Sequence, residues 1–239
     1  MDALFFGSIG TVAETSEMQR RAFNAAFAED GLDWDWGREL YQDMLTRSGG
    51  ADRIRRYADQ HGPDLDDERI ARLHARKTEI FDKEMQETGL TPRPGVRRLL
   101  TEARKEKLPV AFVTATGKEN VDALLTATSG ILRPDDFDLI VTREMIEEGK
   151  PAPDAYNLAL ERLNVSHPLA IEDNAQGVSA AVAAGIPCIA TPGANTTGED
   201  YSDAVAVLPH LGDGEHKLPD VELCKGYVTL AWLHRLTGD

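Results

Sequence analysis

Short apolar runs alternate with longer amphipathic segments along most of this 239-residue chain. The runs are rich in β-branched and bulky residues, which is typical of strands buried on both faces of a sheet. Between the runs, apolar residues recur at helical spacing, as Val96, Leu99 and Ala103 do. We therefore expect an α/β fold: a doubly wound, Rossmann-like parallel sheet with helices on both faces. The expected strands are residues 3–6, 110–113, 139–141, 169–171, 188–190 and 205–208.

One long stretch interrupts this alternation, because residues 15–94 carry only helical patterns. The Pro- and Gly-rich segment 91–95 has the composition of a linker. We expect residues 15–94 to form a helical cap with hinge linkers, inserted after the first strand, and residues 1–14 and 95–239 to form the core. The expected cap helices are 17–29, 37–47, 51–61 and 67–88, and a polar loop over 212–226 precedes a last helix over 228–235.

The chain carries 26 lysine and arginine residues against 41 aspartate and glutamate residues, a net charge of −15. Because an acidic surface repels phosphate backbones, we expect no nucleic-acid partner. No apolar run approaches the ~18 residues that a membrane span needs, and the N-terminus lacks the basic region of a signal peptide. The two cysteines, Cys188 and Cys224, make no disulfide framework. We expect a cytoplasmic protein that has no membrane partner.

Four segments leave the carboxyl ends of the expected strands, where open α/β sheets bind their ligands. They are 7–11 (Gly-Ser-Ile-Gly-Thr), 114–116, 149–151 and 172–174. Together they offer a glycine-rich loop, hydroxyl groups, the ammonium of Lys150 and the carboxylates of Glu172 and Asp173. A loop with free N–H groups beside a lysine predicts a phosphate site. Carboxylates beside it are the oxygen ligands that Mg²⁺ prefers.

The order and spacing of these segments resemble the haloacid dehalogenase superfamily, in its phosphoglucomutase-like branch. Segment 149–156, Gly-Lys-Pro-Ala-Pro-Asp-Ala-Tyr, is similar to the third motif of that family, and 171–177, Ile-Glu-Asp-Asn-Ala-Gln-Gly, to the fourth. Thr114 stands where the second motif has Ser or Thr. The resemblance implies that the helical insertion is a C1-type cap. Within the branch, segments 111–125 and 198–202 look most like the xylulose-1,5-bisphosphate phosphatases of photosynthetic carbon fixation.

The first motif departs from the family pattern Asp-x-Asp-Gly-Thr, because this chain reads Gly7-Ser8-Ile9-Gly10-Thr11. In the family, the first aspartate attacks phosphorus to form an aspartyl-phosphate, and the second protonates the leaving oxygen and then activates water. Each role needs a carboxylate, which neither Gly7 nor Ile9 supplies. Loss of a nucleophile that acts together with its neighbours typically costs on the order of 10⁴–10⁶ in kcat.

Further roles are expected for residues of these segments and of the cap. Thr114 and Lys150 are expected to support catalysis. Arg47 and Arg53 are expected to form the contact between the cap and the substrate. The residues expected to bind phosphate are Ser8, Ile9, Thr114, Ala115 and Lys150.

Mg²⁺ in the family is bound by the nucleophilic carboxylate, a backbone carbonyl of the first motif and the aspartate of the fourth motif. Here the Ile9 carbonyl and the Asp173 carboxylate remain, with Glu172 beside them. Because Mg²⁺ dehydrates reluctantly, one or two carboxylates should hold it only weakly. The lost carboxylates leave Lys150 less compensated, so the pocket should still attract anions.

Two side chains near the first motif are candidate replacement nucleophiles, Ser8 and Glu14, and a metal-bound water is a third candidate. Side chains alternate along an extended strand end, so positions 7 and 9 share a face. The side chain of Ser8 is therefore expected to point away from the pocket.

Structural interpretations compete with these roles. Thr114 or Thr116 either contacts phosphate or only caps the following helix, and Asp173 either binds metal or only caps its own helix. For Lys150, the surrounding Gly-Lys-Pro-Ala-Pro-Asp favours a pocket position over a solvated one. The aromatic residues expected in the core of the cap are Trp34, Trp36 and Tyr41.

Two functions of different classes remain open from sequence. The first is a catalytically impaired phosphatase homologue that binds a small phosphorylated metabolite, or a protein partner, without aspartyl-phosphate turnover. The second is an active hydrolase of the sugar-phosphate phosphatase class that uses a non-standard nucleophile or a metal-bound water.

Overall fold

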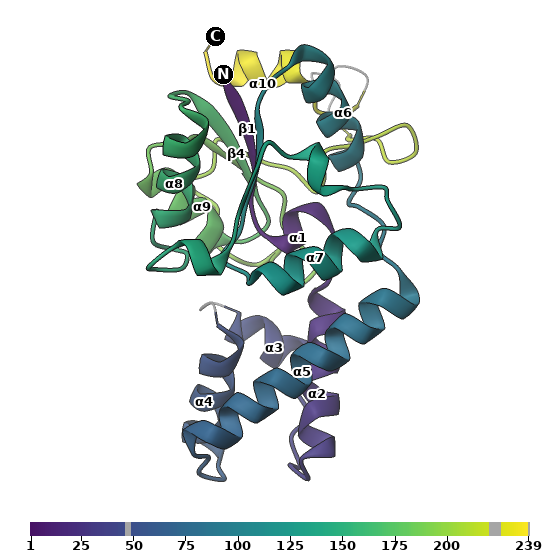
Figure 1. The fold of residues 1–239 in the computed structure, drawn as a ribbon, viewed down its shortest axis with the longest axis vertical. Coiled ribbons are helices and arrows are strands. Elements are labelled where there is room, and N and C mark those ends of the chain that lie inside the picture. Colours follow the sequence, from purple (N-terminus) through teal and green to yellow (C-terminus); the bar gives the residue numbers. More distant parts are fainter. Residues whose placement is uncertain (46–48, 220–225, 239) are drawn as a thin grey trace.

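A parallel sheet flanked by helices forms the upper part of the molecule, and further helices form the lower part (Figure 1). The computed structural model describes residues 1–45, 49–219 and 226–238. Within them the strand order of the sheet is β3-β2-β1-β4-β5-β6, and each neighbouring pair is parallel. The strands are β1 (Ala3–Phe6), β2 (Val110–Val113), β3 (Leu139–Val141), β4 (Pro168–Glu172), β5 (Cys188–Ala190) and β6 (Ala206–Val207).

The expected α/β class and the six expected strands are confirmed, with small differences in length. Strand β4 is one residue longer at each end than the apolar run indicated. Strand β6 has only two residues, although the N–H groups of Val205 and Leu208 still donate to the Cys188 and Ala190 carbonyls of β5. The expected boundaries therefore follow the apolar runs, while hydrogen bonding sets the actual ones.

Side chains of the strands alternate between two hydrophobic clusters, one on each face of the sheet. Leu4 and Phe6 face helices α6 (Val96–Glu106), α7 (Lys118–Ala127) and α10 (Leu230–Leu236). Ala3 and Phe5 face helices α8 (Asp154–Leu163) and α9 (Ala175–Ala183). Burial on both faces explains why the strands read as continuous apolar runs rather than as alternating ones.

Short elements connect these layers: α1 (Ile9–Val12) follows β1, and the 3₁₀ turns η1 (Pro134–Asp136) and η2 (Arg143–Met145) flank β3. The last helix begins two residues later than expected. Thr229 is its N-cap, because the Thr229 hydroxyl accepts a hydrogen bond from the Trp232 N–H at 3.1 Å. The expected polar loop over 212–226 lies partly outside the described residues.

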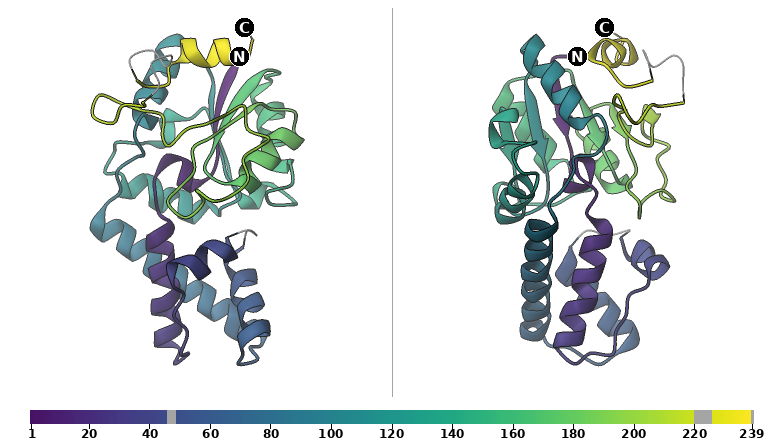
Figure 2. Two further views of the ribbon diagram at one scale, coloured as in Figure 1. Left: turned by 180° about the vertical axis from the view of Figure 1, so that it is seen from behind. Right: turned by 90° about the vertical axis from the view of Figure 1, so that its right-hand side faces the viewer.

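Four helices form the lower part: α2 (Ser16–Glu29), α3 (Arg38–Met44), α4 (Gly50–His61) and α5 (Asp67–Thr88). Helices α2 and α5 run side by side, as Figure 2 shows, and α5 also packs against α7 of the core. The expected aromatic residues pack in the interior of this cap. Trp36 is fully buried, with its ring centroid 4.6 Å from that of Phe27 and 4.9 Å from that of Phe23.

Two chain segments join the cap to the core and lie beside each other. Ala13 and Pro92 form an isolated antiparallel bridge, and the Arg93 N–H donates to the Val12 carbonyl at 2.8 Å. The Arg93 guanidinium donates to four backbone carbonyls, those of Gly10, Thr191, Pro192 and Pro209. One arginine therefore ties the first motif to the loops that follow β5 and β6.

No described helix is both long enough and apolar enough to cross a membrane.

Replacing Arg93 by alanine is expected to lower the free energy of unfolding by about 2–4 kcal/mol, because four carbonyls, three of them partly buried, lose a charged donor. Urea unfolding measures the change. The control is Arg72→Ala, which breaks only an exposed pair with Glu68 on α5 and should cost less than about 0.5 kcal/mol. Equal costs for the two variants would contradict the bridging role of Arg93.

Candidate functional site

The pairing of β1 with β4 places the candidate site. The chain builds β2 and β3 on one side of β1, and β4, β5 and β6 on the other. The point where the direction of winding reverses is where open α/β sheets bind ligands. The Gly7 N–H donates to the Ile171 carbonyl at 2.8 Å, so the first and fourth motifs meet at the carboxyl edge of the sheet.

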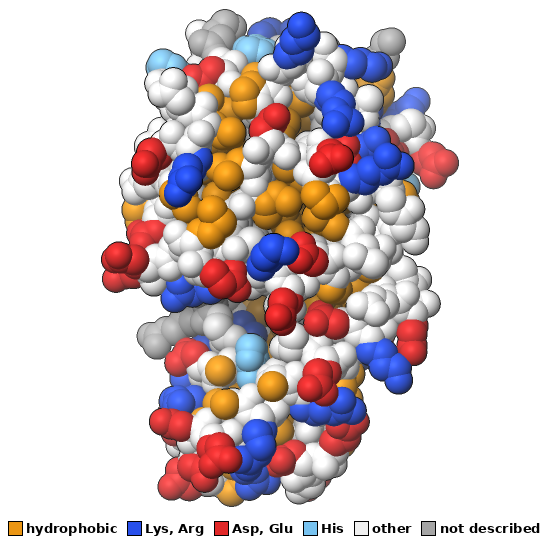
Figure 3. All heavy atoms as spheres, viewed as in Figure 1, with side chains coloured by type: hydrophobic (Ala, Val, Ile, Leu, Met, Phe, Trp, Pro, Cys, Tyr) orange, Lys and Arg blue, Asp and Glu red, His pale blue; other side chains and the backbone are white. Residues whose placement is uncertain are grey.

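A cavity of about 490 Å³ lies at this edge, between the core and the cap. Its volume falls within the ~300–1,000 Å³ of typical small-molecule sites. Figure 3 shows a hollow in the surface where the two parts meet. The core residues lining the cavity include Ser8, Ile9, Gly10, Thr114, Ala115, Lys150 and Asp173, and the cap residues include Gln19, Phe23, Tyr41, Arg53, His74 and Lys77.

Lys150 lines the cavity and is only 6% exposed. Its ammonium donates to the Val113 carbonyl at 2.8 Å and to the Glu172 carboxylate. The alternative of a solvated surface lysine is therefore wrong. A buried ammonium on the wall of a cavity attracts anions, because the low local dielectric strengthens its field.

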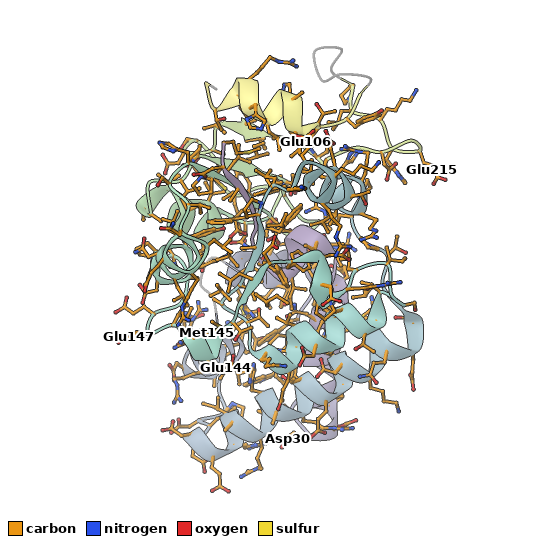
Figure 4. The ribbon with its side chains drawn as sticks, turned by 45° about the horizontal axis from the view of Figure 1, so that its top comes forward. Asp30, Glu106, Glu144, Met145, Glu147 and Glu215 are labelled. Carbon is orange, nitrogen blue, oxygen red and sulfur yellow. The ribbon has the colours of Figure 1, made fainter. Side chains whose placement is uncertain are left out.

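Thr114 is buried at the end of β2 and also lines the cavity. Its hydroxyl accepts a hydrogen bond from the Thr116 N–H at 3.0 Å. Helix α7 is capped instead by Glu144, whose carboxylate accepts the Lys118 N–H at 3.2 Å. Glu144 is labelled in Figure 4, in the 3₁₀ turn η2. The interpretation of Thr114 as only a helix cap is therefore wrong, while its contact with phosphate stays a prediction.

Ser8 points in the direction opposite to the one expected. It lines the cavity, and its hydroxyl donates to the Asp173 carboxylate. Alternation along a strand fails here because β1 ends at Phe6 and α1 begins at Ile9, so Ser8 lies in the turn between them. The prediction that the Ser8 side chain points away from the pocket is wrong.

Asp173 is 8% exposed and lines the cavity. One of its oxygens, Oδ1, accepts hydrogen bonds from the side chains of Ser8, Thr11 and Asn174. Burial raises the pKa of the Asp173 carboxyl, and the nearby Glu172 raises it further. Helix α9 is capped by Asn174, which accepts the Gly177 N–H at 2.8 Å, so the interpretation of Asp173 as only a helix cap is also wrong.

Glu172, expected beside Asp173 as a second metal ligand, lies away from the cavity. It is fully buried and is not among the cavity-lining residues of the described chain. Its carboxylate accepts hydrogen bonds from Lys150, from the Tyr156 hydroxyl at 2.7 Å and from the Ser8 N–H at 3.3 Å. These internal donors occupy its oxygens in this arrangement, so metal binding by Glu172 stays a prediction.

The residues at the edge of the sheet do not fit a Mg²⁺ site. Among the described residues, no three or more His, Cys, Asp or Glu side chains gather as metal ligands. The Oδ1 atom of Asp173 is engaged by three donors, and Oδ2 lies so close to Gly10 that a Cβ there would come within 3.0 Å. Mg²⁺ needs near-octahedral oxygen ligands, which this carboxylate does not present.

Ile9, at the position of the second lost aspartate, lines the cavity and is 5% exposed. It belongs to the same hydrophobic cluster as Leu4 and Phe6. Gly7 is also buried and carries no side chain. The two positions that hold carboxylates in the family therefore present an apolar side chain and a bare backbone.

Among its described residues, the cap supplies three basic side chains to the cavity: Arg53, His74 and Lys77. The Lys77 ammonium lies 4.9 Å from the Phe23 ring centroid and 4.8 Å from that of Phe81. Burial, together with the nearby Arg53, lowers the pKa of Lys77 to about 8. Arg53 is itself buried and lies over the Phe23 and Tyr41 rings, and its contact with a substrate stays a prediction. Arg47 lies outside the described residues.

Lys77 and His74 were not expected from sequence. The signal for Lys77 is its place in the buried stripe of α5, where every other member is apolar: Ile70, Leu73, Phe81 and Met85. A lysine inside such a stripe needs a polar partner or a cavity. It has both, because Lys77 donates to the Gln19 side chain at 3.2 Å and lines the cavity.

Side chains of the cap also contact the rim of the core. The Asn195 amide donates to Glu17 at 3.1 Å and accepts from Gln42 at 3.2 Å. Gln176 donates to the Leu45 carbonyl at 3.4 Å. These hydrogen bonds hold the cap over the carboxyl edge of the sheet, so the cavity is walled on both sides.

Adding Mg²⁺ to the protein up to ~1 mM is expected to give no saturable rise in Tm. A ligand stabilises a protein only when its concentration approaches its Kd, and the expected Kd for Mg²⁺ at this site lies above that range. Differential scanning fluorimetry with EDTA as the blank measures this. Asp173→Asn is the matched control. A rise in Tm that this variant abolishes would show that Asp173 does bind the metal.

Comparison with known proteins places this geometry in a family. The family model described as haloacid dehalogenase-like hydrolase matches residues 1–185. The chain is 40% identical to protein CbbY of Cereibacter sphaeroides, over 89% of this chain and 94% of that protein. It also matches the crystal structure of CbbY from Rhodobacter sphaeroides with phosphate, at a TM-score of 0.81 and 40% identity over 88% of this chain and 94% of that one. A CbbY variant crystallised with xylulose-(1,5)bisphosphate matches equally well. This chain belongs to the haloacid dehalogenase-like hydrolase family.

Proposed function

We propose that this protein binds a small phosphorylated metabolite in the cavity between core and cap, and that it does not turn this ligand over by the aspartyl-phosphate route. The observation that carries the proposal is a cavity with buried cations on both walls, Lys150 on the core side and Arg53 with Lys77 on the cap side. The positions of the two family carboxylates are Gly7 and Ile9.

The cavity is far less acidic than the chain as a whole. Its described lining includes four lysine and arginine side chains, namely Arg53, Lys77, Arg143 and Lys150, and three acidic ones, namely Glu14, Asp173 and Glu199. The whole chain, by contrast, has a net charge of −15. A local excess of cations inside an acidic protein concentrates anionic ligands there and keeps them off the remaining surface.

Cations on two opposite walls suit a ligand with phosphate groups at both ends better than a monophosphate. Lys150 would meet one group at the edge of the sheet, and Arg53 with Lys77 would meet the other in the cap. A related crystal structure contains xylulose-(1,5)bisphosphate, a sugar of this class. The ligand class that we propose is therefore a sugar bisphosphate.

One observation favours the alternative of an active hydrolase with a non-standard nucleophile. The Ser8 hydroxyl faces the cavity and donates to Asp173, so a hydroxyl and a carboxylate lie together where the family has its nucleophile. Serine bound to a base can act as a nucleophile. This alternative predicts phosphate release that Ser8→Ala abolishes.

The test combines binding and turnover on the same samples. Sugar monophosphates and bisphosphates should raise Tm in a saturable way, with bisphosphates the more effective, because binding to the native state stabilises it. Phosphate release from the same compounds, with Mg²⁺ present, should equal the no-enzyme rate.

Lys77→Met should raise the apparent Kd for sugar bisphosphates about tenfold or more, because it removes one buried cation and keeps an unbranched side chain. The matched control is Lys83→Met on the same helix, since Lys83 is exposed and pairs only with Glu87 at 3.9 Å. Phosphate release well above the blank would overturn the proposal in favour of the hydrolase. An equal loss of affinity in the two variants would show that Lys77 of the cap does not contact the ligand.

The affinity for a sugar bisphosphate should fall as pH rises, because Lys77 attracts the ligand only when protonated and the pKa of Lys77 is about 8. Sugar phosphates are already dianions from about pH 7 upward, since their second pKa is ≈ 6. The protonated fraction of Lys77 is about one tenth at pH 9, so the apparent Kd should rise about tenfold between pH 7 and pH 9. Isothermal titration calorimetry measures this Kd at each pH. Lys77→Arg keeps its charge and should show a flat profile over this range.

A further inference from the structure

The loop 191–196, which follows β5, is bound by both chain segments that lead into the cap. The Arg93 guanidinium, after α5, donates to the Thr191 and Pro192 carbonyls. The Glu14 carboxylate, before α2, accepts the Ala194 N–H at 2.7 Å. Both linkers of the cap are therefore fastened to one loop of the core.

Asn195 extends this attachment from the linkers to the cap itself. It lines the cavity and is only 4% exposed. Its amide Nδ2 donates to Glu17 of α2 at 3.1 Å, and its Oδ1 accepts from Gln42 of α3 at 3.2 Å. Gln176 of α9 donates to the cap at 3.4 Å, which is longer than either of these hydrogen bonds. Both polar ends of the buried Asn195 amide are thus satisfied by the cap, as burial requires.

The partner of Asn195 on α2 is itself held in place. The Glu17 carboxylate also accepts hydrogen bonds from Arg20 of α2 and from Arg38 of α3, each at 3.2 Å. An acceptor that is already ordered loses little conformational entropy when it binds one more donor. The contact with Asn195 therefore engages both α2 and α3 as a unit.

The core side of the contact is equally well anchored. The Thr196 hydroxyl donates to the Asp173 carbonyl at 2.6 Å, and it accepts the Gly193 N–H at 2.8 Å. These hydrogen bonds fix the loop to the residue that ends the fourth motif on the cavity wall. Asn195 therefore joins the cap to the wall of the cavity rather than to a loose surface loop.

We propose that Asn195 is a clasp: its hydrogen bonds to Glu17 and Gln42 hold the cap closed over the cavity, and they must break before a ligand can enter or leave. A part joined to the rest by two linkers can move as a hinged body, and such movement of the cap would expose the Asn195 amide. Asn195 acts through the position of the cap and is a positioning residue. The part on closure stands by itself, and the part on ligand entry rests on the proposed function.

The distance between cap and core measures closure directly. Helix α4 belongs to the cap and α8 to the core, as Figure 1 shows. Nitroxide labels on Gln60→Cys of α4 and Arg162→Cys of α8, both exposed positions, report this distance by double electron–electron resonance. Labelling uses a Cys224→Ser background, in which the remaining native cysteine, Cys188, is buried.

Asn195→Asp keeps the shape of the side chain but replaces the donor to Glu17 by a second carboxylate. It should raise the ratio of open to closed protein about tenfold or more, seen as a population with a longer distance between the labels. Adding Glu17→Gln should reverse this shift, because the new amide can donate to the carboxylate at position 195. The control is Asn157→Asp at an exposed position of α8, which should leave the distances unchanged.

Distances that do not change in Asn195→Asp would overturn the clasp. A shift that Glu17→Gln does not reverse would overturn it as well, because a merely structural effect on the loop is not repaired from the cap. If Asn195→Asp does not fold, Gln42→Ala is the second probe. It removes the hydrogen bonds of Gln42 to Asn195 and to the Ala194 carbonyl, and it should also lengthen the distances.

Fructose-1,6-bisphosphate is the probe for the part on ligand entry, with stopped-flow kinetics on the unlabelled proteins. Gln42→Ala is the variant, because it breaks the clasp without changing the charge of the cavity. Its association and dissociation rates should both rise about threefold or more, since a larger fraction of the protein is open. The control is Gln86→Ala at an exposed position of α5, which should leave both rates unchanged.

Equal rates in Gln42→Ala and in the natural protein would overturn the part on ligand entry. If the natural protein does not bind the bisphosphate, the proposed function fails together with this part, while the distance measurements still decide whether Asn195 holds the cap closed.

Discussion

The pairing of β1 with β4 is the constraint on which the rest of the site depends. Two segments that lie more than 160 residues apart become neighbours because Phe6 pairs with Ile171 in register. The residues that follow them, Gly7 and Ser8 on one side and Glu172 and Asp173 on the other, then meet at the edge of the sheet. A shift of one residue in this pairing would turn every side chain to the other face.

Hydrogen bonds within the protein satisfy the charged groups at this edge of the sheet. The Asp173 carboxylate is satisfied by Ser8, Thr11 and Asn174, and the Lys150 ammonium by Glu172 and the Val113 carbonyl. Buried polar groups are costly only when they are left without partners. The protein can therefore keep charged side chains at this edge without either first-motif aspartate.

The cap shows how the same physics keeps cationic side chains in the cavity of an acidic protein. Lys77 donates to Gln19 and lies over the rings of Phe23 and Phe81. Arg53 lies over Phe23 and Tyr41. Aromatic faces stabilise a cation without neutralising it. The two side chains thus keep positive charge at the cavity wall, and the lowered pKa of Lys77 makes its share of that charge depend on pH.

The sequence by itself determined the α/β class, the strands and the helical insertion. Strands buried on both faces need continuous apolar runs, and helices buried on one face need amphipathic stripes. It also determined that positions 7 and 9 lack carboxylates, since this is a matter of residue identity. Spacing placed Thr114, Lys150 and Asp173 near one another, because parallel strands end at one edge. Only the tertiary structure decided where Ser8 and Glu172 point and that Lys77 reaches the cavity. The direction of Ser8 depends on the turn between β1 and α1, and that of Glu172 on the space beside Gly7 and Gly177. The position of Lys77 depends on the packing of α5. These arrangements are set by contacts between residues that are distant in sequence.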